Sequence, residues 1–363
     1  KKSIYFLTSF FFLILSMYTY HAYRIFIPLF SLALALIYKE ELLKIKKTLV
    51  PALIVSIFLV LPLIQFTLSE KGINRATSQS AFKLQDFEKD RLDFDQRSKK
   101  PFRFMSRYLY KKPVYYTYTA TKNYLDHFSA IFLFFKGDQI GRHSQVDMGQ
   151  LYLFDAIFLT SALLFFKKSK FHNLMLAWLL LSPIPASIVT PTPHAYRTFQ
   201  MVIPLTYFSS YGAYYLFKYL QKYKAAQIVL TLFIGYWIVY FAHLLFIHYP
   251  VKFSRDWQYG YKQAVEAAQK YGNSYQKVYM TNANSVPYIY FLFYNSYNPQ
   301  DFIKNGTTKA FSKYEFVDNS QGLYGGGTLL YIGPDWEVVD GKLLETISNP
   351  GGEIVFKVWE ISK

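Results

Sequence analysis

The chain has 363 residues, of which 52% are hydrophobic and 20% aromatic, with 35 Phe, 34 Tyr and no Cys. The lack of Cys excludes disulfides and thiolate chemistry. The formal net charge is +17; in a chain with long apolar runs, Lys and Arg more often anchor loops and bind anionic lipid, so we expect a lipid bilayer as a partner and no nucleic acid.

Apolar stretches fill the chain up to about residue 250 and approach the ~20 residues that a helix needs to cross a bilayer. We predict about seven membrane spans, at 3–20, 24–38, 48–66, 151–166, 171–189, 198–217 and 225–248. The short loops at alternate ends of these spans carry Lys1 and Lys2; Lys39, Lys44, Lys46 and Lys47; Lys167, Lys168 and Lys170; and Lys218, Lys222 and Lys224. The positive-inside rule puts these four clusters in the cytoplasm, which leaves the loop 67–150 and everything after 249 on the extracytoplasmic side.

The chain begins at Lys1-Lys2-Ser3 without Met and enters an apolar stretch almost at once. These few residues are too short and wrongly flanked to be a signal peptide. We therefore expect the earlier spans of a longer protein to be missing from this chain.

The tetrapeptide His-Ala-Tyr-Arg occurs twice, at 21–24 and 194–197, each time just before an apolar run. Cationic side chains beside a membrane span are costly unless they have a function. Both copies fall on the predicted outer face, so we expect His21, Arg24, His194 and Arg197 to form a two-part anion site. In the alternative, each Arg anchors its helix end to lipid headgroups and each His caps it, and the repeat is a coincidence or an old duplication.

The loop 67–150 is too long for a passive connection. Basic and aromatic residues alternate over 102–112, which predicts an interfacial helix. Apolar residues at helical spacing over 124–135 predict a helix too short to span the bilayer, one that dips into the outer leaflet. This region is either a lid packed on the other spans or a gate for a lipid substrate.

A polar, Gly-rich turn follows at 137–150 and leads into the next span. Such a turn suits a backbone that approaches a ligand closely. Arg142 and His143 offer donors suited to phosphate, although Arg142 could equally reach to lipid headgroups. The nearest acids on the outer face, Asp138, Asp147 and Asp155, are expected to be helix caps or Arg partners rather than a catalytic base.

Three motifs together resemble the lipid-carrier-dependent glycosyltransferases of family 39, which include protein O-mannosyltransferases and aminoarabinose transferases. The matching residues are Tyr20-His21 with Arg24 and Pro28, Gly141-Arg142-His143 with Met148-Gly149-Gln150-Leu151-Tyr152, and Pro193-His194 with Arg197 and Pro204. The resemblance covers most of the chain, although each motif is short. It implies a mainly α, GT-C-like transmembrane bundle with a terminal extracytoplasmic domain.

The resemblance also implies an activity: transfer of a sugar from a polyprenyl-phosphate donor to a lipid, glycan or protein acceptor at the outer membrane face. The expected donor-phosphate site consists of His21, Arg24, Arg142, His143, His194 and Arg197. The family's catalytic Asp lies in the first outer loop, which this chain lacks, so no catalytic residue is assigned. No residue is assigned to a metal, and the need for a divalent cation stays open.

Two other classes of protein fit the same sequence. One is a transporter or flippase for lipid-linked sugars, with the same cationic outer site but no chemistry. The other is a membrane scaffold that carries an extracytoplasmic binding domain.

Residues 251–363 read as a separate small α/β domain after the transmembrane region 1–250. An amphipathic helix runs from Trp257 to Ala268 and is closed by Gly272. Strands are predicted at 277–281, 313–317, 328–332 and 353–359, with a short aromatic helix at 287–294. The order of strands and helices favours an α/β arrangement, and no catalytic constellation is visible, so we expect an acceptor-binding or packing role.

Overall fold

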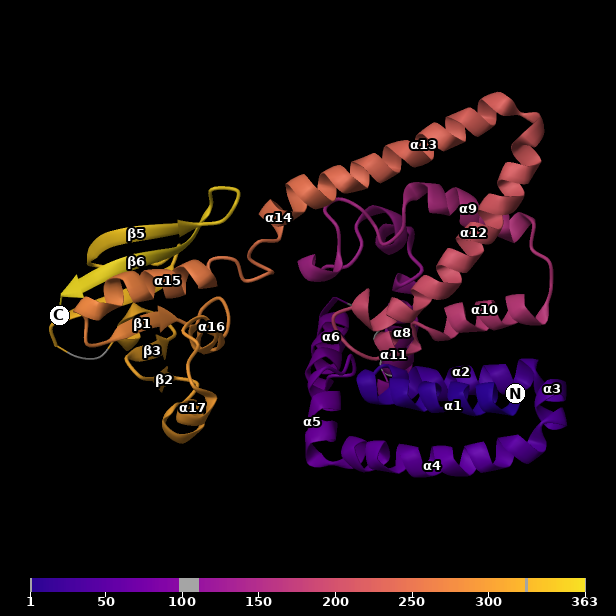
Figure 1. The fold of residues 1–363 in the computed structure, drawn as a ribbon, viewed down its shortest axis with the longest axis horizontal. Coiled ribbons are helices and arrows are strands. Elements are labelled where there is room, and N and C mark those ends of the chain that lie inside the picture. The colour runs from indigo at the N-terminus through magenta and orange to yellow at the C-terminus, as the bar shows by residue number, and fades with distance from the viewer. Residues whose placement is uncertain (1, 98–110, 324–325, 363) are drawn as a thin grey trace. The chain divides into compact units, whose positions relative to one another are not determined.

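The computed structural model describes residues 2–97, 111–323 and 326–362 (Figure 1). The chain divides into two compact units, Lys1–Tyr240 and Phe241–Lys363. The second unit therefore begins inside the last predicted span, 225–248.

The first part of unit 1 is a set of helices: α1 (Lys2–Thr19), α2 (Tyr23–Ile37), α3 (Lys39–Lys44), α4 (Lys46–Leu68), α5 (Glu70–Ser78) and α6 (Leu84–Arg97). Helix α1 packs on α2 and on α4 (Figure 1). Their shared core holds Met17, Phe26, Ile27, Phe30 and Leu63. This packing fixes the α1–α2 turn, which carries the first His-Ala-Tyr-Arg motif.

The second part of unit 1 comprises α8 (Lys112–Asp126), the π-helix η2 (Ile131–Phe135), the 3₁₀ turn η3 (Gly141–His143), α9 (Leu153–Leu164), α10 (Lys170–Leu181), α11 (Ile184–Ser187), the 3₁₀ segment η4 (Tyr196–Met201), α12 (Val202–Tyr219), η5 (Leu220–Lys222) and α13 (Lys224–His243). Helix α12 packs on α9 and α10, and α10 packs on α2. The second His-Ala-Tyr-Arg motif lies where η4 begins, just before α12.

Helices occupy all seven predicted spans, but a bundle of seven complete spans is not shown. Among the described residues, two helical stretches are long and apolar enough to cross a membrane, Leu49–Leu68 and Lys224–Lys252. The predicted span 171–189 is instead divided between α10 and α11. Pro183 and Pro185 lie at this break, and proline lacks the N–H that a continuous helix needs.

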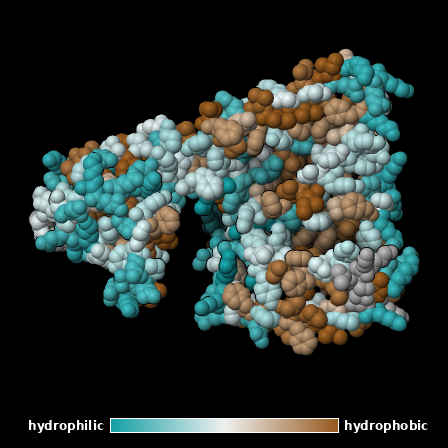
Figure 2. Space-filling view, viewed as in Figure 1, coloured by the Kyte–Doolittle hydropathy of each residue, from teal (hydrophilic) through white to brown (hydrophobic). Residues whose placement is uncertain are grey.

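The two long helices expose much of their apolar surface, as the brown atoms along α4 and α13 show (Figure 2). On α4, Phe58 is 67% exposed, and on α13, Val239 is 70% exposed. Soluble monomers rarely expose large contiguous apolar patches. This surface is therefore evidence, though from two helices only, that the protein associates with a membrane.

The loop 67–150 differs from its prediction. The expected interfacial helix over 102–112 lies outside the described residues, except for its last two positions. The expected helix over 124–135 is two elements, because α8 ends at Asp126 and η2 begins at Ile131. Ser129 Oγ donates to the carbonyl of Asp126 at 2.7 Å, and a hydroxyl that bonds local backbone in this way competes with the helix.

Unit 2 holds the π-helix η6 (Leu244–His248), α14 (Tyr249–Lys252), α15 (Tyr261–Tyr271), η7 (Gly272–Ser274), β1 (Val278–Thr281), α16 (Pro287–Tyr294), α17 (Pro299–Asn305), β2 (Ala310–Phe311), β3 (Tyr314–Val317), η8 (Ser320–Gly322), β4 (Thr328–Pro334), β5 (Lys342–Ser348) and β6 (Ile354–Ser362). The six-stranded sheet has the order β2-β3-β1-β4-β6-β5. Strand β1 runs parallel to β3 and β4, and the other pairs are antiparallel. The predicted small α/β fold is confirmed as a mixed sheet with helices.

Helix α15 covers one face of this sheet through its small apolar residues, among them Ala264, Val265 and Ala268, which are fully buried. The helix begins at Tyr261 rather than at the predicted Trp257, because Gly260 has φ +98°, a left-handed conformation that glycine tolerates. The sequence analysis missed β2 and β5. Strand β5 lies at an edge of the sheet and is mostly exposed, so it lacks a strong apolar signal.

Candidate functional site

Asp138 lies where two distant segments of unit 1 meet, the loop between η2 and α9 and the segment between α11 and α12. Its side chain is fully buried. Oδ1 accepts the N–H of Ile140 at 3.0 Å, and Oδ2 accepts the N–H of Ala195 at 2.7 Å. Backbone donors therefore orient both oxygens, and the carboxylate ties the Gly-rich turn to the second His-Ala-Tyr-Arg motif.

Two glycines allow this loop to fold back on the chain. Gly137 has φ +69°, and a Cβ there would lie 2.4 Å from Oγ of Ser144. At Gly149 a Cβ would lie 2.3 Å from the backbone nitrogen of Phe134. The sequence analysis expected this backbone to approach a ligand, but at these two glycines the close neighbour is the chain itself.

Two histidines face the Asp138 carboxylate. Nδ1 of His143 lies 3.4 Å from Asp138 Oδ2, and Nδ1 of His194 lies 3.7 Å from the same oxygen. The His143 and His194 ring centroids are 4.9 Å apart. One ligand atom from each of these three residues lies within 4.8 Å of the others, so the group has the composition and size of a cation site.

His194 is held as a neutral imidazole. Burial lowers its pKa to about 4, with the Arg197 charge acting in the same direction and the Asp138 charge opposing it. Its Nδ1 accepts the N–H of Arg197 at 3.3 Å. This ring nitrogen therefore carries a lone pair and no proton.

His127, which follows the last residue of α8, holds the backbone of the second motif in place through a hydrogen bond. The ring is fully buried. Its Nε2 accepts the N–H of His194 at 3.2 Å, so Nδ1 must carry the proton, which it donates to the carbonyl of Asn123 at 2.7 Å. Burial lowers the pKa of His127, and its neutral form suits this pair of hydrogen bonds.

The first motif lies beside the second. The Tyr20 ring is 5.2 Å from that of Tyr196 and 4.3 Å from that of His21, and the Tyr20 hydroxyl interacts with the Arg197 guanidinium. The Tyr196 ring in turn stacks on His143 at 5.7 Å. Residues from three predicted motifs are thus brought together.

Several cations surround His21. Burial lowers the pKa of His21, and the positive charges of Arg75, Arg197 and Arg24 lower it further. Charges of one sign near a buried group disfavour a further charge of that sign and attract an anion. The first motif therefore lies in a positive field to which Arg75, from α5, also contributes.

The three predicted arginines have different surroundings. Arg197 is buried, and its Nη1 donates to the carbonyl of Pro191 at 3.3 Å. Arg24 donates to Oγ1 of Thr67 at 3.3 Å, and its guanidinium lies 5.3 Å from the Phe66 ring centre. Arg142 is exposed on the loop. Arg24 thus contacts the end of α4, whereas Arg197 lies inside the histidine cluster.

Among the acids, Asp155 is a helix cap, as expected, because its Oδ2 accepts the N–H of Tyr152 at the start of α9. Asp138 instead faces two histidines. The sequence analysis assigned no role to His127 or Arg75. The only local signal for His127 was its position four residues after Asn123 on a helix. Nothing near Arg75 in the sequence connects it to His21.

Comparison with protein-family models, with curated proteins and with solved structures finds no match to this chain. The interpretation of the site therefore depends on its own geometry and on the motif resemblance.

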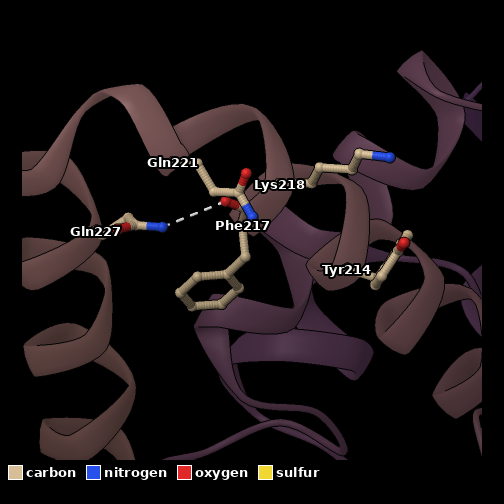
Figure 3. Close-up of a pocket in the computed structure, with 5 residues that line it drawn as sticks. All are labelled: Tyr214, Phe217, Lys218, Gln221 and Gln227. Carbon is tan, nitrogen blue, oxygen red and sulfur yellow. Dashed lines mark hydrogen bonds between the residues drawn. The ribbon is translucent and has the colours of Figure 1, made fainter.

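One open pocket, of about 300 Å³, lies at the turn between α12 and α13 (Figure 3). It is lined by Tyr214, Phe217, Lys218, Gln221 and Gln227. Gln227 Nε2 donates to the carbonyl of Phe217 at 3.3 Å, which ties the two helices together. The pocket lies at the opposite end of α12 from Arg197, so it is not part of the histidine cluster.

Proposed function

We propose that this chain belongs to a multi-pass membrane glycosyltransferase that uses a polyprenyl-phosphate sugar donor. In this proposal, the loop 67–150 and unit 2 lie on the extracytoplasmic side. The three-motif resemblance supports the proposal, and so does the exposed apolar surface of α4 and α13.

The observation that carries the proposal is the meeting of the two motif copies. Tyr20 reaches Tyr196 and Arg197, while His21 lies in the field of Arg75, Arg197 and Arg24. A buried guanidinium with neutral imidazoles beside it offers several hydrogen-bond donors to one phosphate. Such an arrangement suits a phosphate monoester or diester at the end of a lipid.

The proposed reaction breaks the bond between the anomeric carbon of the sugar and the phosphate oxygen. The acceptor hydroxyl oxygen forms the new bond to that carbon, and its proton passes to a carboxylate base. Polyprenyl phosphate leaves with an added negative charge. Arg197 would stabilise this charge more in the transition state than in the bound donor, which is the requirement for catalysis.

Binding of undecaprenyl phosphate to the full chain in detergent tests the proposal, with undecaprenol as the matched lipid without phosphate. We expect binding of the phosphate only, weakened about 10-fold or more in Arg197→Ala because a charged hydrogen bond is lost. Arg91→Ala, at an exposed position of α6, is the matched control and should bind normally. Equal binding of both lipids, or no effect of Arg197→Ala, would contradict the proposal.

A transporter of lipid-linked sugar would pass the binding test as well. The two functions separate when a polyprenyl-phosphate sugar is incubated with the full-length protein and acceptor-containing membranes. Transfer or slow hydrolysis of the sugar supports the enzyme. Movement of the intact donor across a liposome bilayer without cleavage supports the transporter.

A further inference from the structure

We infer that Asp138, His143 and His194 form a binding site for a divalent transition-metal ion. The sequence assigned no metal ligand, and the inference comes from the geometry of these three side chains. Binding of the ion itself does not depend on the proposed function; only its role towards a lipid phosphate does.

The first argument is the arrangement of the donor atoms. Ligand atoms ~2.0–2.1 Å from a tetrahedral ion lie roughly 3.3 Å from one another. Asp138 Oδ2 is 3.4 Å from Nδ1 of His143 and 3.7 Å from Nδ1 of His194. These two distances are within a few tenths of an ångström of that spacing, and the ligand atoms of all three residues lie within 4.8 Å of one another.

The second argument is a buried ring nitrogen that lacks a hydrogen-bond partner. Nδ1 of His143 is buried and has no hydrogen-bond partner among the described residues. Nδ1 of His194 already accepts the N–H of Arg197, so an ion bound at this atom would have to replace that hydrogen bond. A buried polar atom without a partner costs free energy, and a cation bound at Nδ1 of His143 removes that cost.

The third argument is the support behind the ligands. The Asp138 carboxylate is oriented by the N–H groups of Ile140 and Ala195. The His194 backbone is held by His127, whose own tautomer is fixed by Asn123. Metal sites commonly have such an outer shell, which orients their first ligands.

The donor set selects the class of ion. Two imidazole nitrogens and one carboxylate suit Zn²⁺, Mn²⁺ or Co²⁺, whereas Mg²⁺ and Ca²⁺ prefer oxygen ligands. Three protein ligands leave at least one coordination position for another group. On the proposed function, a phosphate oxygen of the donor lipid would take that position, close to Arg197.

The test is a Co²⁺ titration of the purified full-length chain in detergent, followed by visible absorption and by metal analysis with Zn²⁺. We expect one ion per chain and a Co²⁺ spectrum of nitrogen and oxygen ligands. Asp138→Asn and His143→Ala should each weaken Co²⁺ binding by at least about 100-fold. Loss of an outer-shell residue typically weakens metal binding ~10–100-fold, and loss of a direct ligand should weaken it more. His143→Ala is the decisive variant, because its Nδ1 has no hydrogen bond to lose, so folding should be intact.

Two controls separate this site from adventitious binding. Asp126 is the last residue of α8, and its carboxylate pairs with Lys122. Asp126→Asn should bind Co²⁺ normally. His248→Gln removes an exposed histidine whose Nε2 lies 3.1 Å from that of His243, a pair that could bind Co²⁺ by itself. Loss of the ion only in His248→Gln, or full binding in both Asp138→Asn and His143→Ala, would overturn the inference.

The remaining outcomes separate the metal site from the proposed function. If Co²⁺ binds tightly and its absorption spectrum does not change when undecaprenyl phosphate is added, the metal site is supported and its role in donor binding is contradicted. No Co²⁺ binding by a folded protein that still binds undecaprenyl phosphate through Arg197 overturns the metal site alone. In that case Asp138 and His143 would act as a hydrogen-bonded pair.

Discussion

The N–H of His194 donates to Nε2 of His127 at 3.2 Å, so a fully buried ring at the end of α8 fixes the backbone of the second His-Ala-Tyr-Arg motif. Because the same ring donates to the carbonyl of Asn123, its tautomer and orientation are determined. The lid-like loop and the predicted anion site are therefore one structure in this part of unit 1. A lid that moved away from the other spans as a rigid piece would break this bond.

His127→Ala should destabilise unit 1. The substitution leaves the N–H of His194 and the carbonyl of Asn123 without their partner, and each stranded buried group costs roughly 1–3 kcal/mol. We expect a lower midpoint of thermal unfolding in detergent and weaker binding of undecaprenyl phosphate. His248→Gln, at an exposed position, is the control; an unchanged midpoint in His127→Ala would show that the bond contributes little.

Gly212→Ala should disrupt the packing of α12 on α9. A Cβ at this position would lie 1.8 Å from the carbonyl oxygen of Phe158, a backbone atom that cannot move without shifting α9. Gly235→Ala, in α13, meets nothing within 4 Å and should be neutral or slightly stabilising, because Ala favours a helix by about 1 kcal/mol. Thermal unfolding of the two variants side by side measures the difference, and equal midpoints would contradict the close helix contact.

The predicted topology can be tested with single cysteines, because the chain has none of its own. Ser78 and Ser312 are exposed and predicted to be extracytoplasmic, so Ser78→Cys and Ser312→Cys should both react with an impermeant thiol reagent in intact cells. Lys222→Cys, at an exposed position in a predicted cytoplasmic cluster, should react only after permeabilisation. Labelling of only one of the two serine positions would mean that the number of spans between them is wrong by an odd number.

Substitution of the paired arginines by Ala and by Lys tests whether they bind phosphate. Arg197→Ala and Arg24→Ala are each expected to cut sugar transfer by roughly one to two decades, equivalent to about 1.5–3 kcal/mol for a lost charged hydrogen bond. Arg→Lys should restore only part of the activity at a phosphate site, because Lys keeps the charge but loses the planar fork.

A headgroup anchor behaves in another way, because Lys then replaces Arg almost fully and transfer survives Ala. Transfer assays with the four variants of the full-length protein give the answer. Near-normal activity in both Ala variants would remove the phosphate-site hypothesis.

The sequence determined the elements whose signals are local. The apolar runs predicted helices in every span, and short runs of apolar and aromatic residues predicted β1, β3, β4 and β6. The two copies of His-Ala-Tyr-Arg were visible as a repeat. Their pairing in space was only a hypothesis, since nothing local connects residues 20 and 196.

The tertiary structure decided which side chains meet. Asp138 follows a helix by a few residues and reads as a cap. Its contact with His194 exists because two loops far apart in the chain meet, and such contacts have no sequence period. It also decided where helices end within apolar runs. Pro183 and Pro185 interrupt one run because proline lacks the backbone N–H, and Ser129 interrupts another because its hydroxyl bonds the local backbone. The pattern of apolar residues specified most of the helices and strands. The tertiary structure then brought together the α1–α2 turn, the end of α8, the Gly-rich turn and the start of η4, whose residues no spacing rule connects.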